Sequence, residues 1–152
     1  MLLAHIHPAL VHFPIVLVLL LLLSDLVIVV RRESNPRAAW PSASAILGGL
    51  ATLAAILTYV FGDIAYDIAL ENGLPEADLE THEGWGTITA IVIAVLGLVR
   101  VVLWLRNRAH GPRVRPLLLV ASAAASALVI VTAYFGGDLV YHLGVNVEAV
   151  IR

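Results

Sequence analysis

The chain has 152 residues, of which 61% are hydrophobic and only 13% are charged. This composition lies far outside the range of soluble globular domains and predicts an integral membrane protein with one compact domain. Cysteine is absent, which excludes disulfides, thiolate catalysis, cysteine-ligated iron–sulfur clusters and covalently attached c-type haem. Every basic residue is arginine, which excludes Schiff-base chemistry on lysine, and no polybasic stripe suits nucleic acid.

Four apolar stretches predict membrane-spanning helices, because each has about the 20 residues needed to cross the hydrocarbon core. They lie at about 8–30, 38–61, 85–105 and 116–135. The first stretch lacks the basic start and the small-residue cleavage site of a signal peptide, so we expect it to be retained. The predicted fold class is therefore all-α, a polytopic four-helix bundle in a single domain of residues 1–152.

The charged residues between these stretches are sorted by sign. Arginines follow the first and third stretches, whereas residues 62–84, between the second and third, carry seven acidic side chains and no basic one. The positive-inside rule then places the arginine-rich loops in the cytoplasm. Both termini and the acidic loop are expected on the outer side.

Two short motifs predict an internal repeat. FGDIAYD at 61–67 returns as GGDLVYH at 136–142. Three matches are separated by 75 positions: Asp63 with Asp138, Tyr66 with Tyr141, and His7 with His82. We therefore predict two repeated helical hairpins, at 1–75 and 76–152, both starting and ending outside. Small residues in the second and fourth stretches predict close helix packing.

Histidines gather on the predicted outer side of the membrane. Only His110 belongs to an inner loop; the other five are His5, His7, His12, His82 and His142. Pro14 cannot donate a hydrogen bond to the carbonyl of Leu10, so the first helix should bend or loosen around His12. His12 is thereby expected near the outer edge of the hydrocarbon, facing a partner inside the bundle.

His82 opens the third stretch and His142 ends the fourth. Gly84 and Gly86 leave bare backbone beside His82, which suits tight helix packing or a flat ligand. Imidazoles presented by different helices at similar depth are the arrangement needed for bis-histidine haem ligation. We therefore predict haem b, with iron held by His12 and His82 and with His7 and His142 as substitutes.

Carboxylates and tyrosines near these histidines are candidates for supporting roles. Asp63 or Asp138 could fix an imidazole tautomer, or could instead cap a helix or hydrogen-bond Tyr66 and Tyr141. Asp25, near the inner end of the first stretch, is either a buried partner for an arginine or an ordinary interface residue.

The segment HPALVHFPIVL at 7–17, followed by Asp25, resembles the signature of a family of small bacterial multi-pass membrane proteins, domain of unknown function 2231. The resemblance extends over most of the chain, and His7, His12 and His82 match it residue by residue. It implies a four-helix protein of the bacterial inner membrane, from a family that is often suspected of binding haem or serving redox chemistry and has no assigned reaction.

The leading hypothesis is electron transfer near the outer membrane face, to or from a quinol or an external redox protein. One alternative is a non-catalytic subunit packed in a larger respiratory or transport complex, and another is an outer-face metal-binding protein using His5, His7 and the acidic loop. A stand-alone enzyme is less favoured, because no nucleophile–base constellation is present. Exposed apolar helices also make a homo-oligomer plausible.

Overall fold

The computed structural model of the protein describes residues 5–108, 111–145 and 147; His110 lies outside these ranges. Its helices are α1 (Ile6–Leu10), α2 (His12–Val30), α3 (Ala39–Glu71), α4 (Glu76–Leu105) and α5 (Val114–Tyr141). No strand occurs within the described part of the chain, so the predicted all-α class is confirmed. Four helical segments are long and apolar enough to cross a membrane, with α1 and α2 counted together as Ile6–Val30.

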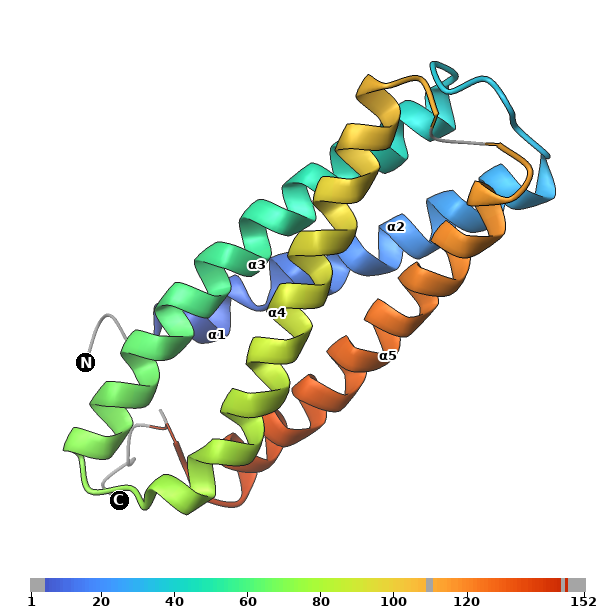
Figure 1. Cartoon of the computed structure of the whole chain (residues 1–152). Helices are drawn as coiled ribbons and strands as arrows, with labels where there is room; N and C mark the ends of the chain where they lie inside the picture. Colours follow the sequence, from blue (N-terminus) through green and yellow to red (C-terminus); the bar gives the residue numbers. More distant parts are fainter. Residues whose placement is uncertain (1–4, 109–110, 146, 148–152) are drawn as a thin grey trace.

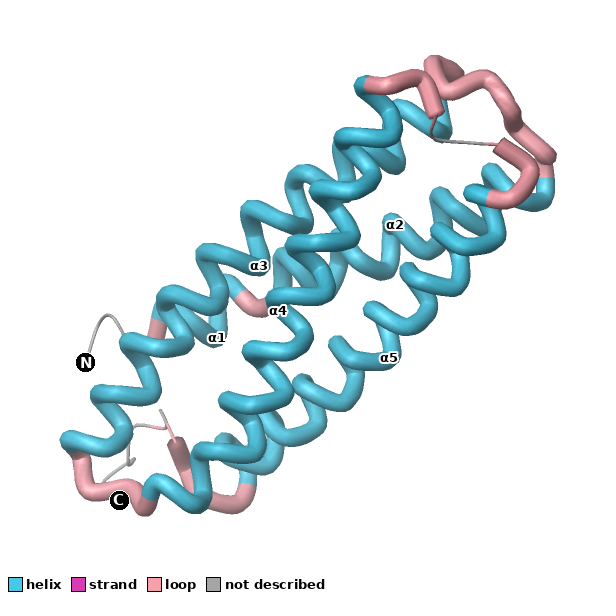
Figure 2. The backbone as a smooth tube through the Cα atoms, in the orientation of Figure 1, coloured by secondary structure: helices cyan, strands magenta, loops and turns pink. Residues whose placement is uncertain are grey.

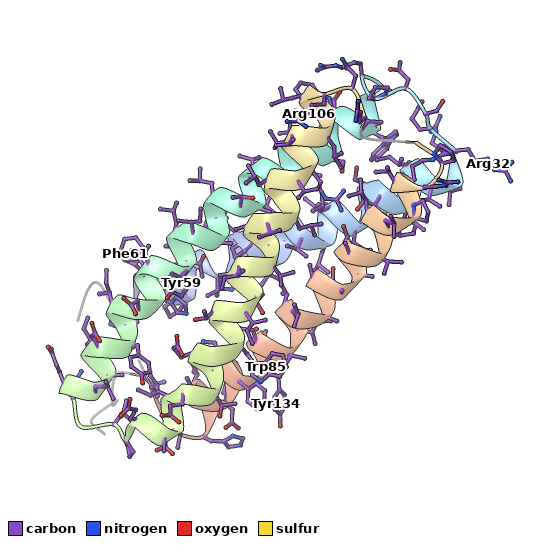
Figure 3. The ribbon with its side chains drawn as sticks, viewed as in Figure 1. Arg32, Tyr59, Phe61, Trp85, Arg106 and Tyr134 are labelled. Atoms are coloured by element: carbon purple, nitrogen blue, oxygen red, sulfur yellow. The ribbon has the colours of Figure 1, made fainter. Side chains whose placement is uncertain are left out.

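The four long helices form a bundle in which each packs against two others (Figure 1). Helix α3 contacts α2 and α4, and α5 closes the ring by contacting α4 and α2. The loops that carry Arg32 and Arg106 lie together at one end of the bundle (Figure 3). The turn between α3 and α4 lies at the opposite end, where α5 also ends, and α1 lies in this half of the bundle (Figure 1). We call these the arginine end and the acidic end.

Helices α3 and α4 extend well beyond the predicted apolar stretches. The segment predicted as an acidic loop is mostly helical, and only residues 72–75 separate α3 from α4. Acidic side chains favour this extension at the start of α4, because Glu76 and Asp78 lie in its first turn, where the helix dipole attracts negative charge. As a result, His82 lies in the second turn of α4 rather than at its start.

The first membrane segment is interrupted near the acidic end. The bend predicted around His12 is a break at Val11, which Figure 2 shows as a short non-helical segment between α1 and α2. Pro14 explains this break, since it supplies no N–H for the carbonyl of Leu10. The next backbone bond, from Ile15 N to Val11 O, is correspondingly long at 3.4 Å.

The apolar core draws its residues from both halves of the chain. Its six buried residues form three pairs separated by 75 or 74 positions: Val18 with Ile93, Ala51 with Ala125, and Ala55 with Val129. Alanine and valine at these positions let the helices approach closely.

The closest approach joins α3 and α4. A Cβ built on Gly97 would overlap the backbone of Gly48, so no side chain fits there. The hydroxyl of Thr52 donates to the carbonyls of Gly48 and Ala94, at 3.0 and 3.3 Å, and thereby links the two helices where they cross.

Candidate functional site

A cavity of about 1040 Å³ opens between the helices at the acidic end of the bundle. All five helices contribute to its wall, and apolar side chains such as Ile15, Ile93 and Val129 form its floor. Its size is at the upper end of the roughly 300–1,000 Å³ typical of small-molecule sites. The cavity is therefore large enough for an organic cofactor.

Two histidines from different helices lie close together in this cavity. The ring centroids of His7, on α1, and His82, on α4, are 6.3 Å apart, and the ring planes are inclined by 75°. Nδ1 of His7 is 3.0 Å from the carbonyl oxygen of Thr58, and Nδ1 of His82 is 3.2 Å from that of Thr132. Because a carbonyl can only accept a hydrogen bond, Nδ1 carries the proton in both rings and Nε2 keeps its lone pair.

Glycines on the neighbouring helices make room for the two rings. A Cβ built on Gly62 would lie 3.0 Å from Cε1 of His7, and one on Gly136 would lie 2.8 Å from Cε1 of His82. Each imidazole is thus seated against bare backbone and oriented by a carbonyl four residues earlier on the same neighbouring helix. This arrangement fixes both tautomer and ring orientation, as is usual for metal-binding histidines.

The carbonyl groups of Thr58 and Thr132 have different surroundings. The hydroxyl of Thr132 donates to the carbonyl of Trp85 at 3.2 Å and is 2.8 Å from the hydroxyl of Thr89. The hydroxyl of Thr58 is buried, and no group among the described residues hydrogen-bonds to it. Leu10 and Pro14 stand 75 positions before Trp85 and Thr89, so the position that corresponds to Thr89 in the first half of the chain is a proline.

The other predicted ligands are not placed opposite His82. His12 lies at the first position of α2, borders the cavity and is exposed. His142 is exposed at the end of α5, where its Nδ1 is 2.5 Å from the carboxylate of Asp138. The structure therefore pairs His82 with His7.

The predicted supporting residues are spread around the cavity rim. Asp63, Tyr66, Tyr141 and Gly86 border the cavity, whereas a Cβ built on Gly84 would meet no heavy atom within 4 Å. The glycines that make room for the imidazoles are Gly62 and Gly136. The role predicted for Gly84 and Gly86, in tight helix packing or beside a flat ligand, stays a prediction.

The described residues around the histidine pair offer it no third ligand of the usual metal-binding types. Among the described residues, no three His, Cys, Asp or Glu side chains are grouped so as to hold a metal ion. His5, the further residue of the predicted outer-face metal site, is exposed. The donor set at the centre of the cavity is thus two imidazoles.

A second polar cluster lies nearer the arginine end. Arg100 makes a bidentate ion pair with Asp25, with nitrogen–oxygen distances of 2.8 and 2.6 Å, and both side chains are almost fully buried. The hydroxyls of Ser44 and Ser122 donate to the Asp25 carboxylate, and Arg100 donates to the carbonyl of Leu118. Asp25 is therefore a buried partner for an arginine, and the cluster joins α2, α3, α4 and α5.

No role was predicted for Arg100, because it lies within an apolar stretch. Its position offers a signal, since it stands 75 positions after Asp25, the same separation as between His7 and His82. An isolated charge inside a membrane span is normally paired, which also points to a carboxylate on another helix.

The bundle and its paired histidines define a polytopic four-helix membrane protein with a cofactor-sized cavity at one end. The family model described as "Predicted membrane protein (DUF2231)" matches residues 4–149, and the chain belongs to this family. The suspected resemblance is thereby confirmed. No curated protein and no solved structure matches the chain.

Proposed function

We propose that the protein is a membrane-embedded b-type haem protein that transfers electrons, with His7 and His82 as the axial ligands. The observation that carries this proposal is the close pair of imidazoles in the cavity. A metal–imidazole bond is about 2 Å long and each ring centre lies roughly 1 Å behind its nitrogen, so two axial imidazoles need centroids about 6 Å apart. The observed separation is 6.3 Å.

The chemistry of the donor set fits haem better than a bare metal ion. Structural zinc sites use four protein ligands and catalytic ones three, whereas haem iron takes its axial ligands alone from the protein. Two imidazoles with free Nε2 atoms complete such a set. The proposal takes His7 in place of His12, because the ring of His7 lies beside that of His82.

Within this proposal, the chain holds and orients the ligands and excludes water. The carbonyls of Thr58 and Thr132 would fix the two imidazoles, and the apolar floor of the cavity would keep the site dry. Haem itself supplies one-electron transfer when it is bound.

The proposed location is the outer side of a bacterial inner membrane, with the arginine end in the cytoplasm. A site at the acidic end would then be reached from the membrane surface. Two partner classes suit this position: a quinol dissolved in the lipid and a redox protein outside.

The test is an absorption spectrum of the protein purified in detergent from cells supplied with haem precursor. We expect a Soret band at one haem per chain with the narrow visible bands of a low-spin, bis-histidine iron. Addition of a short-chain quinol, or of a soluble reductant protein, should convert the oxidised spectrum to the reduced one.

The ligand assignment is checked with single alanine variants. His7→Ala and His82→Ala should each lose the low-spin spectrum, while the matched control His142→Ala, at an exposed position, should keep it. If His12→Ala loses the spectrum and His7→Ala keeps it, the axial pair is His12 with His82. A haem-supplied protein without a Soret band rules out the function, and stoichiometric co-purified partners would then favour a subunit role.

A further inference from the structure

A second hollow lies on the outer surface of the bundle, near the arginine end. It is a groove of about 300 Å³ between α3 and α4, at the lower end of the range for small-molecule sites. Ile46 and Leu50 are 61% and 48% exposed, so the groove opens on the face that contacts lipid. Apart from one glycine, the lining residues are aliphatic or aromatic: Ala45, Ile46, Gly49, Leu50, Val101 and Trp104.

The depth of this groove depends on the missing side chain of Gly49. A Cβ built on Gly49 would lie 3.5 Å from Cγ2 of Val101, which is an ordinary van der Waals contact. The neighbouring Gly48 is different, because a Cβ there would lie 3.2 Å from Cα of Gly97, and it serves the close packing of the two helices. A larger side chain at position 49 would therefore fill part of the groove without displacing the backbone.

An arginine lies beside the end of the groove. The guanidinium of Arg37 stacks on the ring of Trp104, with its central carbon 4.0 Å from the ring centroid. Nε of Arg37 donates to Oδ1 of Asn107 at 2.8 Å, and the indole N–H of Trp104 donates to the hydroxyl of Ser42 at 3.2 Å. Both side chains are thus held in place, which reduces the entropy lost when a ligand binds to them.

The terminal nitrogens of Arg37 are available for an anion. Among the described residues, the only ion pair made by an arginine is that of Arg100 with Asp25, so Arg37 has no carboxylate partner there. A guanidinium can bind a phosphate bidentately while it stacks on an aromatic ring. The surrounding charge also attracts anions, because residues 31–38 and 106–115 contain seven arginines and one acidic residue.

We infer that this groove binds an anionic phospholipid, with an acyl chain along the groove and the phosphate on Arg37. An apolar groove that leads to a basic group at the membrane surface matches the two parts of such a lipid. A second copy of the chain fits less well. Copies in one membrane share their orientation, so two arginine ends would be brought together and would repel each other.

The first experiment identifies the lipid next to Trp104 in vesicles. When Trp40→Phe and Trp85→Phe are combined, Trp104 is the only tryptophan left, and bromine atoms on a lipid chain quench its fluorescence on contact. Phosphatidylglycerol with brominated chains is compared with brominated phosphatidylcholine at the same mole fraction in unlabelled phosphatidylcholine. We expect phosphatidylglycerol to bind about fivefold more tightly, because of the charge of one arginine near the surface.

Variants of the two parts of the site test the assignment. Arg37→Gln should remove most of the preference for phosphatidylglycerol. The matched control Arg113→Gln removes the same charge from an exposed position outside the groove and should keep the preference. Gly49→Leu should also reduce quenching by brominated phosphatidylglycerol, because leucine fills the groove, whereas Ala124→Leu, at an exposed position on α5, should not.

Equal quenching by the two lipids overturns the inference, and this comparison needs no substitution in the groove. A preference that survives Arg37→Gln also overturns it. Equal losses in Arg37→Gln and Arg113→Gln would show attraction by the overall charge instead of a site. A dimer that Gly49→Leu converts to a monomer, measured by light scattering in detergent, would assign the groove to a second copy. None of these measurements requires bound haem, so the lipid site and the proposed haem site stand or fall separately.

Discussion

Gly136 has only a hydrogen atom where any other residue would have a Cβ, and that Cβ would contact the ring of His82. The Cβ of an alanine there would lie 2.8 Å from Cε1 of the ring, which is closer than real Cβ contacts, so the imidazole would have to move. Gly84 is on the same helix as His82, and a Cβ there would meet nothing within 4 Å. The two glycines therefore provide a matched pair of substitutions.

We predict that Gly136→Ala lowers haem occupancy by more than half, because an axial ligand displaced by a few tenths of an ångström loses bond strength. Gly84→Ala should bind haem as the wild type does. The ratio of Soret to protein absorbance in purified samples measures both. Equal occupancy in the two variants would show that Gly136 does not set the position of the ligand.

The sequence predicts the histidines of the site better than their pairing. The separation of 75 positions already connected His7 with His82, but the expected depth of His12 favoured that residue instead. The same separation aligns Gly62 with Gly137, whereas the structure places Gly136 against His82, because α5 contains one more residue at this point. The roles of Thr58 and Thr132 depend on main-chain carbonyls, which leave no trace in side-chain identity.

At the scale of the helices, the ion pair of Asp25 and Arg100 determines how the bundle is held together. Neither charge can reach water, and removal of one partner leaves the other buried without compensation, at a cost of about 3–5 kcal/mol. Replacing both by apolar residues removes that penalty.

We therefore predict that Asp25→Leu and Arg100→Met each destabilise the bundle strongly, and that the double variant is more stable than either single one. Titration of each purified variant with a denaturing detergent, with helix content followed by circular dichroism, measures the order of their stabilities. Glu83→Gln, at an exposed residue whose carboxylate accepts a hydrogen bond from the Thr87 hydroxyl, is the control and should change little. Additive effects of the two substitutions would contradict a coupled pair.

The number of membrane helices follows from hydropathy, but their ends do not. Hydropathy marks where the chain leaves lipid, whereas a helix continues until its hydrogen bonds are interrupted. Helix α3 has 33 residues, or about 50 Å at 1.5 Å per residue, and exceeds the roughly 30 Å of hydrocarbon by several turns. The predicted spans consequently missed the helical parts of residues 62–84.

At the scale of the whole molecule, orientation in the membrane decides which compartment the histidine pair faces. Because the chain contains no cysteine, single cysteines can be introduced without a background. Glu80→Cys lies at the acidic end and Gly111→Cys in the second arginine loop, and nothing crowds a side chain at Gly111.

We predict that a membrane-impermeant maleimide labels Glu80→Cys on cells with a permeable outer envelope and labels Gly111→Cys only after the inner membrane is opened. We expect this labelling pattern because arginine-rich loops are retained in the cytoplasm. The unsubstituted chain is the control for specificity. The reverse labelling pattern would place the histidine pair on the cytoplasmic side.

The sequence does not predict which helices are adjacent in the bundle, because helix faces made of leucine, valine and alanine can pack against any similar face. In the structure the Asp25–Arg100 pair joins α2 to α4 across the interior, and α3 and α5 each contact both of these helices.

The opposite signs of these two charges also have a consequence for assembly. Asp25 and Arg100 occupy positions 75 apart, one in each hairpin, and they meet in the interior. Two copies of the first hairpin would set carboxylate against carboxylate, and two copies of the second would set guanidinium against guanidinium, which in lipid costs several kcal/mol. The two opposite charges thus favour packing of the first half of the chain against the second over packing of two like halves.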